Sequence, residues 1–396
     1  MTEIVLTEYH TKTFSKEIIP EAIALIIAQK YSSQITINFD WQTQKWQLSP
    51  KGWIGIIPIT SDFSIRLQPK TQIKYIWQML GWVENLQSLK IFDSLSDSEP
   101  LENICDRLAR ILAKKIFHRT KQGLYSTYLS DQAQLTAPRG QIQWHRAARQ
   151  PWETRLPCRY STQTADVREN QILLWTIHQL GRSPYLFQPE TTDQLRHAHR
   201  ALQHSISLTP FTAKDCHNFH YHRLNEDYEI LHQLCHFFLA NLSPSHQIGN
   251  AQTIPFLLNT AILYEKFVYA WLKQNLPEQY EIKAQEKYRF NEKTHFNIDL
   301  VLYDTYTKKA IAVLDTKYKT PEKPSPQDLS QIISYATFKH TQRAILIYPK
   351  PLKYSVEEIK SNIQIETLTF SLDKDLEQAG NDFLHTLFAN ILNLKE

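Results

Sequence analysis

The sequence predicts an α+β protein of several domains, because three kinds of apolar patterning follow one another along the chain. Short alternating segments dominate the start, helical spacing dominates the middle, and helices alternate with apolar strands after Pro255. Alternation with a period of two indicates strands, whereas apolar residues three or four apart indicate helices. We therefore expect a small mixed α/β domain over 1–95, a mainly helical region over 100–250 and an α/β domain over 251–396.

The expected N-terminal domain contains two helices with strands between them. Pro20 precedes an apolar helical run over 22–28, and a second helix is expected over 73–83. Alternating segments separated by turn-prone residues predict strands at 34–39, 46–48, 53–59 and 63–67. Pro69 ends the last strand, since proline cannot donate to a strand ladder. A polar, acidic stretch over 94–100 then marks a domain boundary.

The middle region combines helices with an excess of basic residues. Apolar residues at helical spacing predict helices over 101–117, 170–180 and 228–239. The segment 135–144 contains Pro138 and Gly140, which predict a turn that leads into a short strand. Between Arg107 and Arg168, twelve Lys and Arg residues face three Asp and Glu residues. Such a stretch can supply contacts to phosphate groups.

The last 140 or so residues carry the clearest pattern of alternating helices and strands. A helix is expected over 257–274, and it is followed by three strand-like runs, a Pro-rich loop, a helix and a buried strand. In chain order these elements are 280–290, 295–303, 310–318, the loop, 328–338 and 344–348. This order predicts a central mixed sheet covered by helices.

Composition excludes several classes of protein. Apolar residues make up 42% and charged residues 21% of the chain, which is ordinary for a globular protein. With eight glycines and neither a Walker loop nor a dinucleotide fingerprint, the chain is not expected to bind a nucleotide by those routes. We expect a reduced, cytoplasmic protein without membrane contact, because no signal peptide, long apolar span or CxxC pair is found.

The most informative residues are charged side chains placed in apolar strands. Asp299 lies within the run Asn297–Val301, and Asp315 ends another apolar run with Lys317 two residues later. Because side chains in a strand alternate with a period of two, Asp315 and Lys317 project from the same face. If the two strands are neighbours, Asp299 joins them. Two carboxylates beside an amine form a site for a hard divalent cation such as Mg²⁺.

This arrangement predicts hydrolysis of phosphodiesters. A bound cation would neutralise the scissile phosphate and lower the pKa of a water, while Lys317 would orient or deprotonate that water. Two weaker candidates lie in the flanking helices: Glu265 as a third carboxylate ligand, and Gln331 as a positioning residue. The alternative is that Asp-x-Lys lies on an exposed edge strand without catalytic function. The surrounding apolar runs argue against that, because burying unpaired charges is costly.

Two further sets of residues have competing interpretations. Cys216 and His220 have a zinc-ligand spacing, but no second pair follows, which favours histidines that serve packing or the surface. Arg139, Arg146 and Arg149 are interleaved with aromatic residues, which suits a DNA backbone or an acidic partner surface. The competing interpretation is a solvated helical face with the aromatic residues in the core. Together with Lys319, these arginines are the candidate DNA-binding residues.

The C-terminal motifs resemble the PD-(D/E)xK nuclease superfamily and, within it, the McrC family of McrBC modified-cytosine restriction systems. The segments that carry this resemblance are Leu263–Phe267, Asn297–Asp299, Leu314–Lys319, Asp328–Gln331 and Tyr335–Ala336. Weaker similarity covers Ile65–Lys70, Arg139–Ile142, Cys158–Asp166 and Asn170–Leu173. The family's nuclease motif corresponds to Asp299, Asp315 and Lys317, with Glu265 and Gln331 as its helical Glu and Gln. Ile298 replaces the proline of that motif, which shapes a strand and performs no chemistry.

The resemblance implies a restriction-endonuclease-like α/β domain that cuts DNA with Mg²⁺, for which Mn²⁺ can substitute. It also implies a partner, a GTP-hydrolysing AAA+ ring of the McrB type whose GTPase activity the chain stimulates. The N-terminal domain is the expected contact for that ring. A non-catalytic adaptor that retains a nuclease-like scaffold is the alternative function.

Overall fold

A computed structural model gives the positions of residues 2–60, 62–86, 101–242, 246–248, 251–289, 295–319, 321–360 and 362–392. The chain divides into two compact units. The first comprises Met1–Leu101, Gln247–Ala251 and Pro255–Glu396, and the second comprises Glu102–His246 and Gln252–Ile254. The segments expected to be the first and third domains thus share one unit, and the middle region forms most of the other. The linker expected at 94–100 lies outside the described residues.

The first unit contains a sheet with the strand order β1-β6-β5-β12. These strands are β1 (Thr2–Thr7), β6 (Phe63–Gln68), β5 (Trp53–Thr60) and β12 (Phe256–Asn259). Although β12 comes from far along the chain, it pairs antiparallel with β5. Gly55 permits this approach, because a Cβ atom there would lie 2.0 Å from the carbonyl oxygen of Phe256. The N-terminal sheet is therefore completed by the segment that leads into the C-terminal part of the unit.

A second, smaller sheet shares its core with the first. Its order is β2-β4-β3, formed by β2 (Lys12–Ser15), β4 (Lys45–Pro50) and β3 (Ile35–Asp40). Helix α1 (Glu21–Lys30) turns Ala24 and Ile27 inward, where they meet Leu48 and Ile57 in one apolar cluster. Each such large apolar side chain contributes about 1.5–3 kcal/mol when fully buried. This cluster holds α1 and the two sheets together.

The C-terminal part of the first unit is built on a mixed sheet, as the sequence predicts. Its order is β13-β14-β15-β16-β18-β17. The strands are β13 (Tyr280–Arg289), β14 (His295–Asp304), β15 (Ala310–Thr316), β16 (Arg343–Tyr348), β18 (Ile363–Thr369) and β17 (Glu357–Lys360). β14 pairs antiparallel with both β13 and β15, whereas β15, β16 and β18 run parallel to one another. Every residue of β16 is buried, as expected of a central strand covered on both faces.

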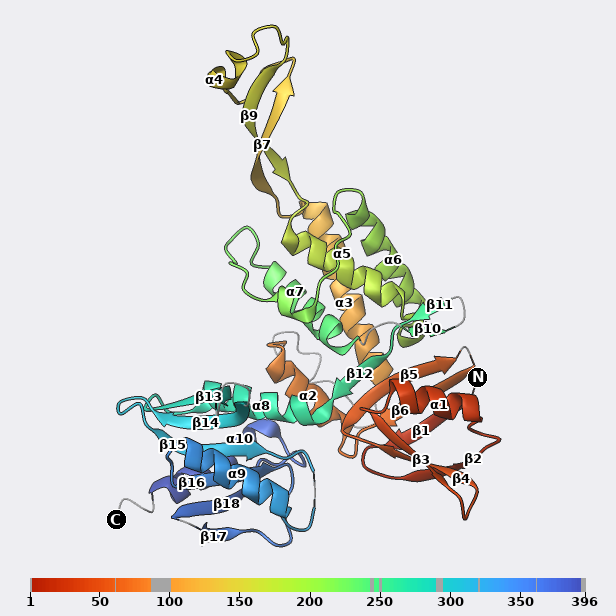
Figure 1. Cartoon of the computed structure of the whole chain (residues 1–396), viewed down its shortest axis with the longest axis vertical. Coiled ribbons are helices and arrows are strands. Elements are labelled where there is room, and N and C mark those ends of the chain that lie inside the picture. The colour runs from red at the N-terminus through yellow and green to blue at the C-terminus, as the bar shows by residue number, and fades with distance from the viewer. Residues whose placement is uncertain are drawn as a thin grey trace. The chain divides into compact units, whose positions relative to one another are not determined.

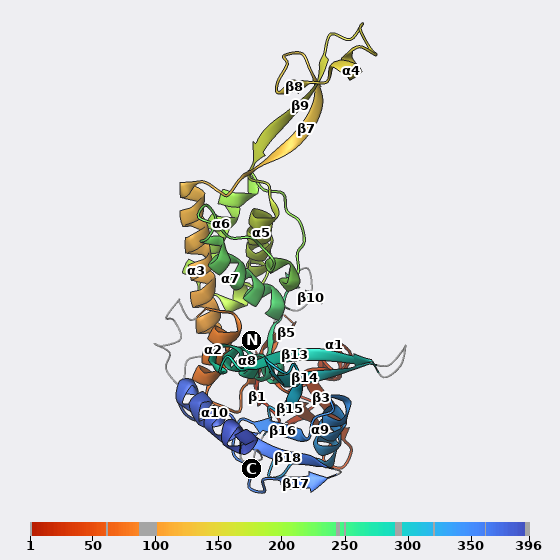
Figure 2. The same cartoon turned by 90° about the vertical axis from the view of Figure 1, so that its left-hand side faces the viewer.

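Helices cover both faces of this sheet. Figure 2 shows α9 (Pro326–Phe338) and α10 (Leu376–Leu392) on opposite sides of it. α9 contributes Ile332 and Ala336 to a core shared with the strands. On the other face, Trp271 of α8 (Thr260–Asn275) and Phe383 of α10 each place a ring 5.3 Å from the ring of Phe370. Helix α2 (Ile73–Val83) packs against α8.

The predicted start of α8 is wrong by one turn. Residues 257–259 belong to β12, and the helix begins at Thr260 because the Asn259 side chain accepts a hydrogen bond from the Ile262 N–H at 3.0 Å. An Asn at this position satisfies one of the amide groups left unpaired at the start of a helix. The apolar residues Leu257 and Leu258 are instead buried in the N-terminal sheet.

The second unit is a set of packed helices. The helices are α3 (Leu101–Gln122), α5 (Arg168–Gly181), α6 (Pro189–Gln203) and α7 (Tyr228–Asn241), with 3₁₀ turns at Pro184–Leu186 and Ala213–Cys216. The three helices that the sequence predicts here are confirmed, and α6 adds to them. Buried Asn170 joins the elements, since it donates to the carbonyls of Tyr125 and Ala165 and accepts from the Tyr228 hydroxyl at 2.6 Å. Short strands β10 (His246–Ile248) and β11 (Ala251–Thr253) follow α7.

A long antiparallel arm projects from these helices, as Figure 1 shows. It consists of β7 (Thr127–Leu135) and β9 (Leu156–Thr164), with the short strand β8 (Gln141–Ile142) beside β9 and helix α4 (Trp144–Ala147) near the far end. Gly140 adopts φ +70° at the turn before β8, and a Cβ there would lie 2.4 Å from the carbonyl oxygen of Arg159. Within the described ranges, no helix is both long and apolar enough to cross a membrane.

Candidate active site

The two acidic residues predicted to form the site lie opposite each other on neighbouring strands. β14 and β15 are antiparallel, with Leu300 opposite Leu314. One step further along the same register, Asp299 faces Asp315. Their carboxyl groups are close enough for one, when protonated, to donate a hydrogen bond to the other. The Thr316 backbone N–H donates a further hydrogen bond to Asp299.

Asp315 is a charged residue in a fully buried position. Its side chain is 0% exposed, and Lys317 Nζ lies 2.7 Å from its Oδ2. Within the described part of the chain, neither of its carboxylate oxygens accepts a hydrogen bond of regular geometry. Burial raises the pKa of Asp315 and nearby Asp299 raises it further, while Lys317 opposes both effects. Such a carboxylate needs a cation or additional donors to be stable in its ionised form.

Lys317 is held in place by helix α9. Its Nζ donates to Gln331 Oε1 at 3.1 Å, and Gln331 Nε2 in turn donates to the Tyr335 hydroxyl at 2.8 Å. A capping box between Ser325 and Asp328 fixes the start of this helix. Burial lowers the pKa of Lys317, but Asp315, Asp328 and Asp299 together outweigh this effect, so the pKa is raised. The amine therefore stays protonated and oriented beside Asp315.

Glu265 approaches the two aspartates from α8. Burial raises its pKa, and the charge of Asp315 raises it further. The Gln285 side-chain amide donates a hydrogen bond to Glu265 Oε1. Gln285 lies in β13 with φ +51°, a conformation that residues other than glycine rarely adopt. Strained backbone of this kind gathers at functional sites, and here it accompanies a side chain that orients the third carboxylate.

The donor set fits a hard divalent cation whose remaining ligands come from water and substrate. In the described ranges, no three His, Cys, Asp or Glu side chains form a ready-made metal cage. Mg²⁺ does not require one, because it is commonly bound by one or two carboxylates together with waters and phosphate oxygens. Among the described residues, neither buried oxygen of Asp315 accepts a hydrogen bond of regular geometry, and Asp299 faces it. This pair suits a magnesium ion, with Glu265 nearby as an outer carboxylate.

The four candidate DNA-binding residues lie in two different places. Lys319 follows the active-site strand and is paired with Asp328 at 2.5 Å. Arg139, Arg146 and Arg149 belong to the arm in the second unit. Arg139 lies over the ring of Tyr160, 5.2 Å from its centroid. Lys319 thus shares the unit of the acidic pair, whereas the three arginines belong to a separate group.

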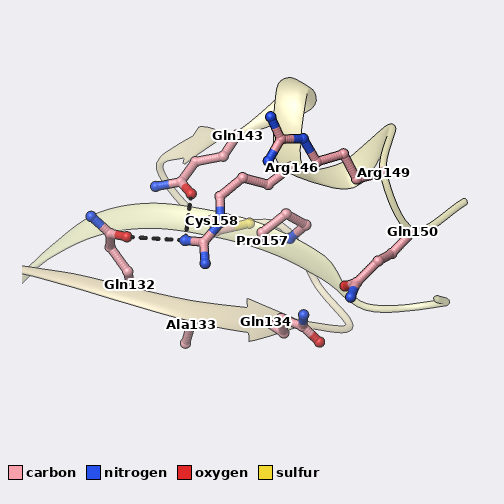
Figure 3. A pocket seen from close by; sticks show the side chains of 9 residues that line it. All are labelled: Gln132, Ala133, Gln134, Gln143, Arg146, Arg149, Gln150, Pro157 and Cys158. Atoms are coloured by element: carbon pink, nitrogen blue, oxygen red, sulfur yellow. Dashed lines mark hydrogen bonds between the residues drawn. The ribbon is translucent and has the colours of Figure 1, made fainter.

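A polar pocket of about 250 Å³ lies near the far end of the arm. It is lined by Gln132, Ala133, Gln134, Gln143, Arg146, Arg149, Gln150, Pro157 and Cys158. Figure 3 shows the Arg146 guanidinium held by Gln132 Oε1 and Gln143 Oε1, at 3.3 and 3.0 Å. With two guanidinium groups and no acidic side chain in its lining, the pocket suits an anionic group.

The zinc interpretation of Cys216 and His220 receives no support from the local structure. The pair would need one continuous helix to face the same way, but the 3₁₀ turn Ala213–Cys216 ends at the cysteine. Cys216 is buried. His232, from the same histidine-rich stretch, is also buried, and its ring nitrogens contact the Tyr221 hydroxyl and the Glu169 carbonyl. His232 therefore packs in the core with a hydrogen-bonding partner for each ring nitrogen.

Sequence reasoning missed several residues that support the site. Gln285 gives no sequence signal, because its importance comes from a local backbone conformation. Tyr335 and Asp328 were noted only as part of the family resemblance, although one anchors Gln331 and the other caps α9. The Ser-Pro-x-Asp pattern that begins at Ser325 is a recognisable capping signal, so the start of α9 was predictable from the sequence.

Comparison with known proteins agrees with the resemblance. A chain in the refined half-complex from a tetradecameric assembly of Thermococcus gammatolerans McrB AAA+ hexamers with bound McrC aligns with a TM-score of 0.57 and 15% identity, covering 98% of this chain and 100% of that one. A chain in the cryo-EM structure of the Thermococcus gammatolerans McrBC complex aligns with a TM-score of 0.45 and 16% identity, covering 70% and 89%. A search of curated proteins gave no significant match.

The first of these alignments shows a shared fold. The model of the McrBC 5-methylcytosine restriction system component family matches residues 48–349, which is most of the sequence and includes the β14–β15 pair and α9. This chain therefore belongs to the McrBC 5-methylcytosine restriction system component family.

Proposed function

We propose that this chain is the Mg²⁺-dependent DNA endonuclease subunit of an McrBC-like restriction complex, with a C-terminal domain of the PD-(D/E)xK type. The observation that supports this most strongly is the acidic pair on β14 and β15. Asp299 faces Asp315, and the Lys317 amine lies 2.7 Å from Asp315. A buried carboxylate pair beside an oriented amine is costly for a purely structural role, whereas phosphodiester hydrolysis uses each of these groups.

Each side chain has a definite task in this proposal. Asp299 and Asp315 would hold the cation, with Glu265 as a third carboxylate. When bound, a magnesium or manganese ion supplies charge neutralisation at the scissile phosphate and a more acidic water. Lys317, protonated and held by Gln331, orients that water and stabilises the negative charge that develops on the phosphate. The Gln331–Tyr335 hydrogen bond keeps this amine fixed.

We also propose an AAA+ GTPase of the McrB type as the partner. The chain of similar fold comes from a complex of McrB AAA+ hexamers with bound McrC. With eight glycines and neither a Walker loop nor a dinucleotide fingerprint, the present sequence leaves GTP binding to the partner. Stimulation of that GTPase, with the N-terminal domain as the ring contact, completes the proposal. Arg139, Arg146, Arg149 and Lys319 remain the proposed DNA contacts.

Plasmid cleavage tests the proposed chemistry. Wild type and three variants are assayed with the partner ring, GTP, Mg²⁺ and 5-methylcytosine-containing plasmid. Asp315→Asn and Lys317→Met are expected to lower the cleavage rate by at least about 100-fold, the usual cost of removing a group that stabilises developing charge. Lys309→Met, an exposed lysine just before β15, is the matched control and should cut normally.

GTP hydrolysis by the partner is measured in the same samples, because it reports assembly independently of cleavage. Both site variants should stimulate the GTPase as wild type does. If they cut like wild type, the assigned site is wrong. If wild type stimulates the GTPase but never cuts DNA, the chain is an adaptor rather than a nuclease.

A further inference from the structure

A polar cluster centred on a buried carboxyl group connects the N-terminal sheet to the strand that carries the proposed active site. At its centre, Glu8 follows β1 and is 0% exposed. The Thr260 hydroxyl donates to Glu8 Oε1, and the Lys70 backbone N–H donates to Oε2 at 3.2 Å. Burial raises the pKa of Glu8 to about 7, although these donors oppose the shift. The carboxyl group is thus tied to two segments that lie far apart in the sequence.

Lys70 completes the cluster from the end of β6. Its Nζ donates to the backbone carbonyl of Tyr318 at 3.1 Å, and lies 4.3 Å from the ring centroid of Tyr318 and 4.8 Å from that of Tyr9. The Thr71 hydroxyl adds a hydrogen bond to the Tyr318 hydroxyl at 3.0 Å. We call Glu8, Tyr9, Lys70, Thr71, Thr260 and Tyr318 the Lys70 cluster.

The Lys70 cluster contacts both segments that carry active-site side chains. Tyr318 comes directly after Lys317, in a tight turn where the Lys319 N–H donates to the Lys317 carbonyl at 2.7 Å. Thr260 is the first residue of α8, the helix that bears Glu265. Residues at the end of β1 and β6 therefore hold the backbone next to Lys317 and the start of the helix that bears Glu265.

The polar character of this contact needs an explanation. A buried network of charged groups is weak evidence for stability, because apolar residues of the same volume often stabilise as well or better. What such a network provides is a fixed relative geometry, since each donor and acceptor is satisfied in one arrangement only. A catalytic site has that requirement, because a displacement of about 1 Å can cost about 100-fold in rate.

We propose that Lys70 and Glu8 are positioning residues of the nuclease site, which hold the Tyr318 turn so that Lys317 and Asp315 meet the scissile phosphate. The inference rests on the proposed nuclease function and adds the N-terminal sheet to the catalytic scaffold. Neither residue is among the groups that would touch substrate or cation. Their effect is transmitted through the backbone of residues 317–319.

The test is Lys70→Met, which keeps the aliphatic stem and removes the ammonium group. Lys45→Met, on an exposed position of β4 in the same unit, is the matched control. In the plasmid assay with partner, GTP and Mg²⁺, Lys70→Met is expected to lower kcat about 10- to 100-fold. Three quantities should stay within about twofold of their wild-type values: KM, the DNA affinity measured with Ca²⁺ in place of Mg²⁺, and the partner's GTPase activity. The reason is that the substitution does not change how tightly the substrate binds. Lys70→Arg, which can still donate to the Tyr318 carbonyl, should recover part of the rate.

The outcomes separate this inference from the proposed function. If wild type cuts and Lys70→Met cuts at the same rate, the positioning role is refuted while the nuclease function stands. If wild type does not cut at all, the nuclease function fails and the inference fails with it. Should Lys70→Met not fold, Thr71→Val replaces it, because it removes only the hydroxyl contact to Tyr318. A folded Thr71→Val variant with unchanged kcat would then refute the inference.

Discussion

Replacing Asp315 by asparagine is expected to stabilise the metal-free protein while it abolishes cleavage. Burial and nearby Asp299 raise the pKa of Asp315 from 3.8 to about 7. One pKa unit corresponds to about 1.4 kcal/mol, so ionising this residue costs the folded state about 4 kcal/mol relative to the unfolded chain. Asparagine removes that cost but buries an amide without an assured partner, which costs about 1–3 kcal/mol. The net gain in the free energy of unfolding at pH 8 should therefore be about 1–3 kcal/mol.

The gain should depend on pH with a definite sign. Between pH 3.8 and about 7, the folded protein binds the Asp315 proton more tightly than the unfolded chain does. The contribution of Asp315 to stability therefore falls as the pH rises through this window and is lowest above it. The advantage of Asp315→Asn should accordingly be largest at pH 8 and shrink or reverse at pH 5.

Urea unfolding followed by circular dichroism in EDTA, at pH 8 and at pH 5, measures this directly. Added Mg²⁺ should stabilise wild type more than the variant, because only wild type retains both carboxylates, and a ligand that binds the folded state stabilises it. The reasoning is refuted if Asp315→Asn is less stable than wild type at pH 8 in EDTA. It is also refuted if the difference between the two proteins is the same at both pH values.

Three further predictions concern stability, each measured by urea or thermal unfolding. Because burial raises the pKa of Glu8 to about 7, its contribution to the free energy of unfolding should fall as the pH rises from 4.5 to 7. Glu8→Gln should make this free energy less dependent on pH in that range, and an unchanged dependence would contradict the prediction. Gly380→Ala should destabilise by about 1–3 kcal/mol, since its Cβ would lie 2.1 Å from the Trp271 ring, whereas Gly181→Ala, with nothing within 4 Å, should be neutral or better. Ser325→Ala should cost about 1 kcal/mol through loss of the α9 cap; no change would mean that Asp328 alone maintains it.

Elements with strong local patterning were predictable from the sequence. The helix Ile73–Val83 has the expected bounds, and strand β5 (Trp53–Thr60) extends one residue beyond the expected 53–59. In both, an apolar run bounded by turn-prone residues marks the element, and most of its side chains are buried. The start of α8 was predicted wrongly because it depends on a contact that is distant in the sequence. Leu257 and Leu258 are apolar in either structure, and only pairing with the distant strand β5 makes them a strand.

In the candidate site, too, features that depend on neighbouring residues were predictable, whereas features that depend on distant contacts were not. The shared face of Asp315 and Lys317 follows from strand alternation, and the pairing of β14 with β15 meets the condition under which Asp299 was expected to join them. The contact between Lys70 and Tyr318 spans 248 positions and leaves no periodic signal. The φ of +51° at Gln285 is likewise invisible, because glutamine has no preference for that conformation. The candidate catalytic residues could be picked out from the local sequence, whereas the residues that orient them could not.

The position of β12 has a consequence for the order in which the protein can fold during synthesis. Strand β5 is synthesised early, but its neighbour β12 is made only after the 195 residues of 61–255 have been added. Until then, the backbone groups along that edge of β5 have no strand partner, and an open edge of this kind invites pairing with other chains. The second unit is nearly continuous in sequence and can become compact during the interval. Until β12 has been synthesised, the β5 edge of the N-terminal sheet is therefore open to mispairing with other chains.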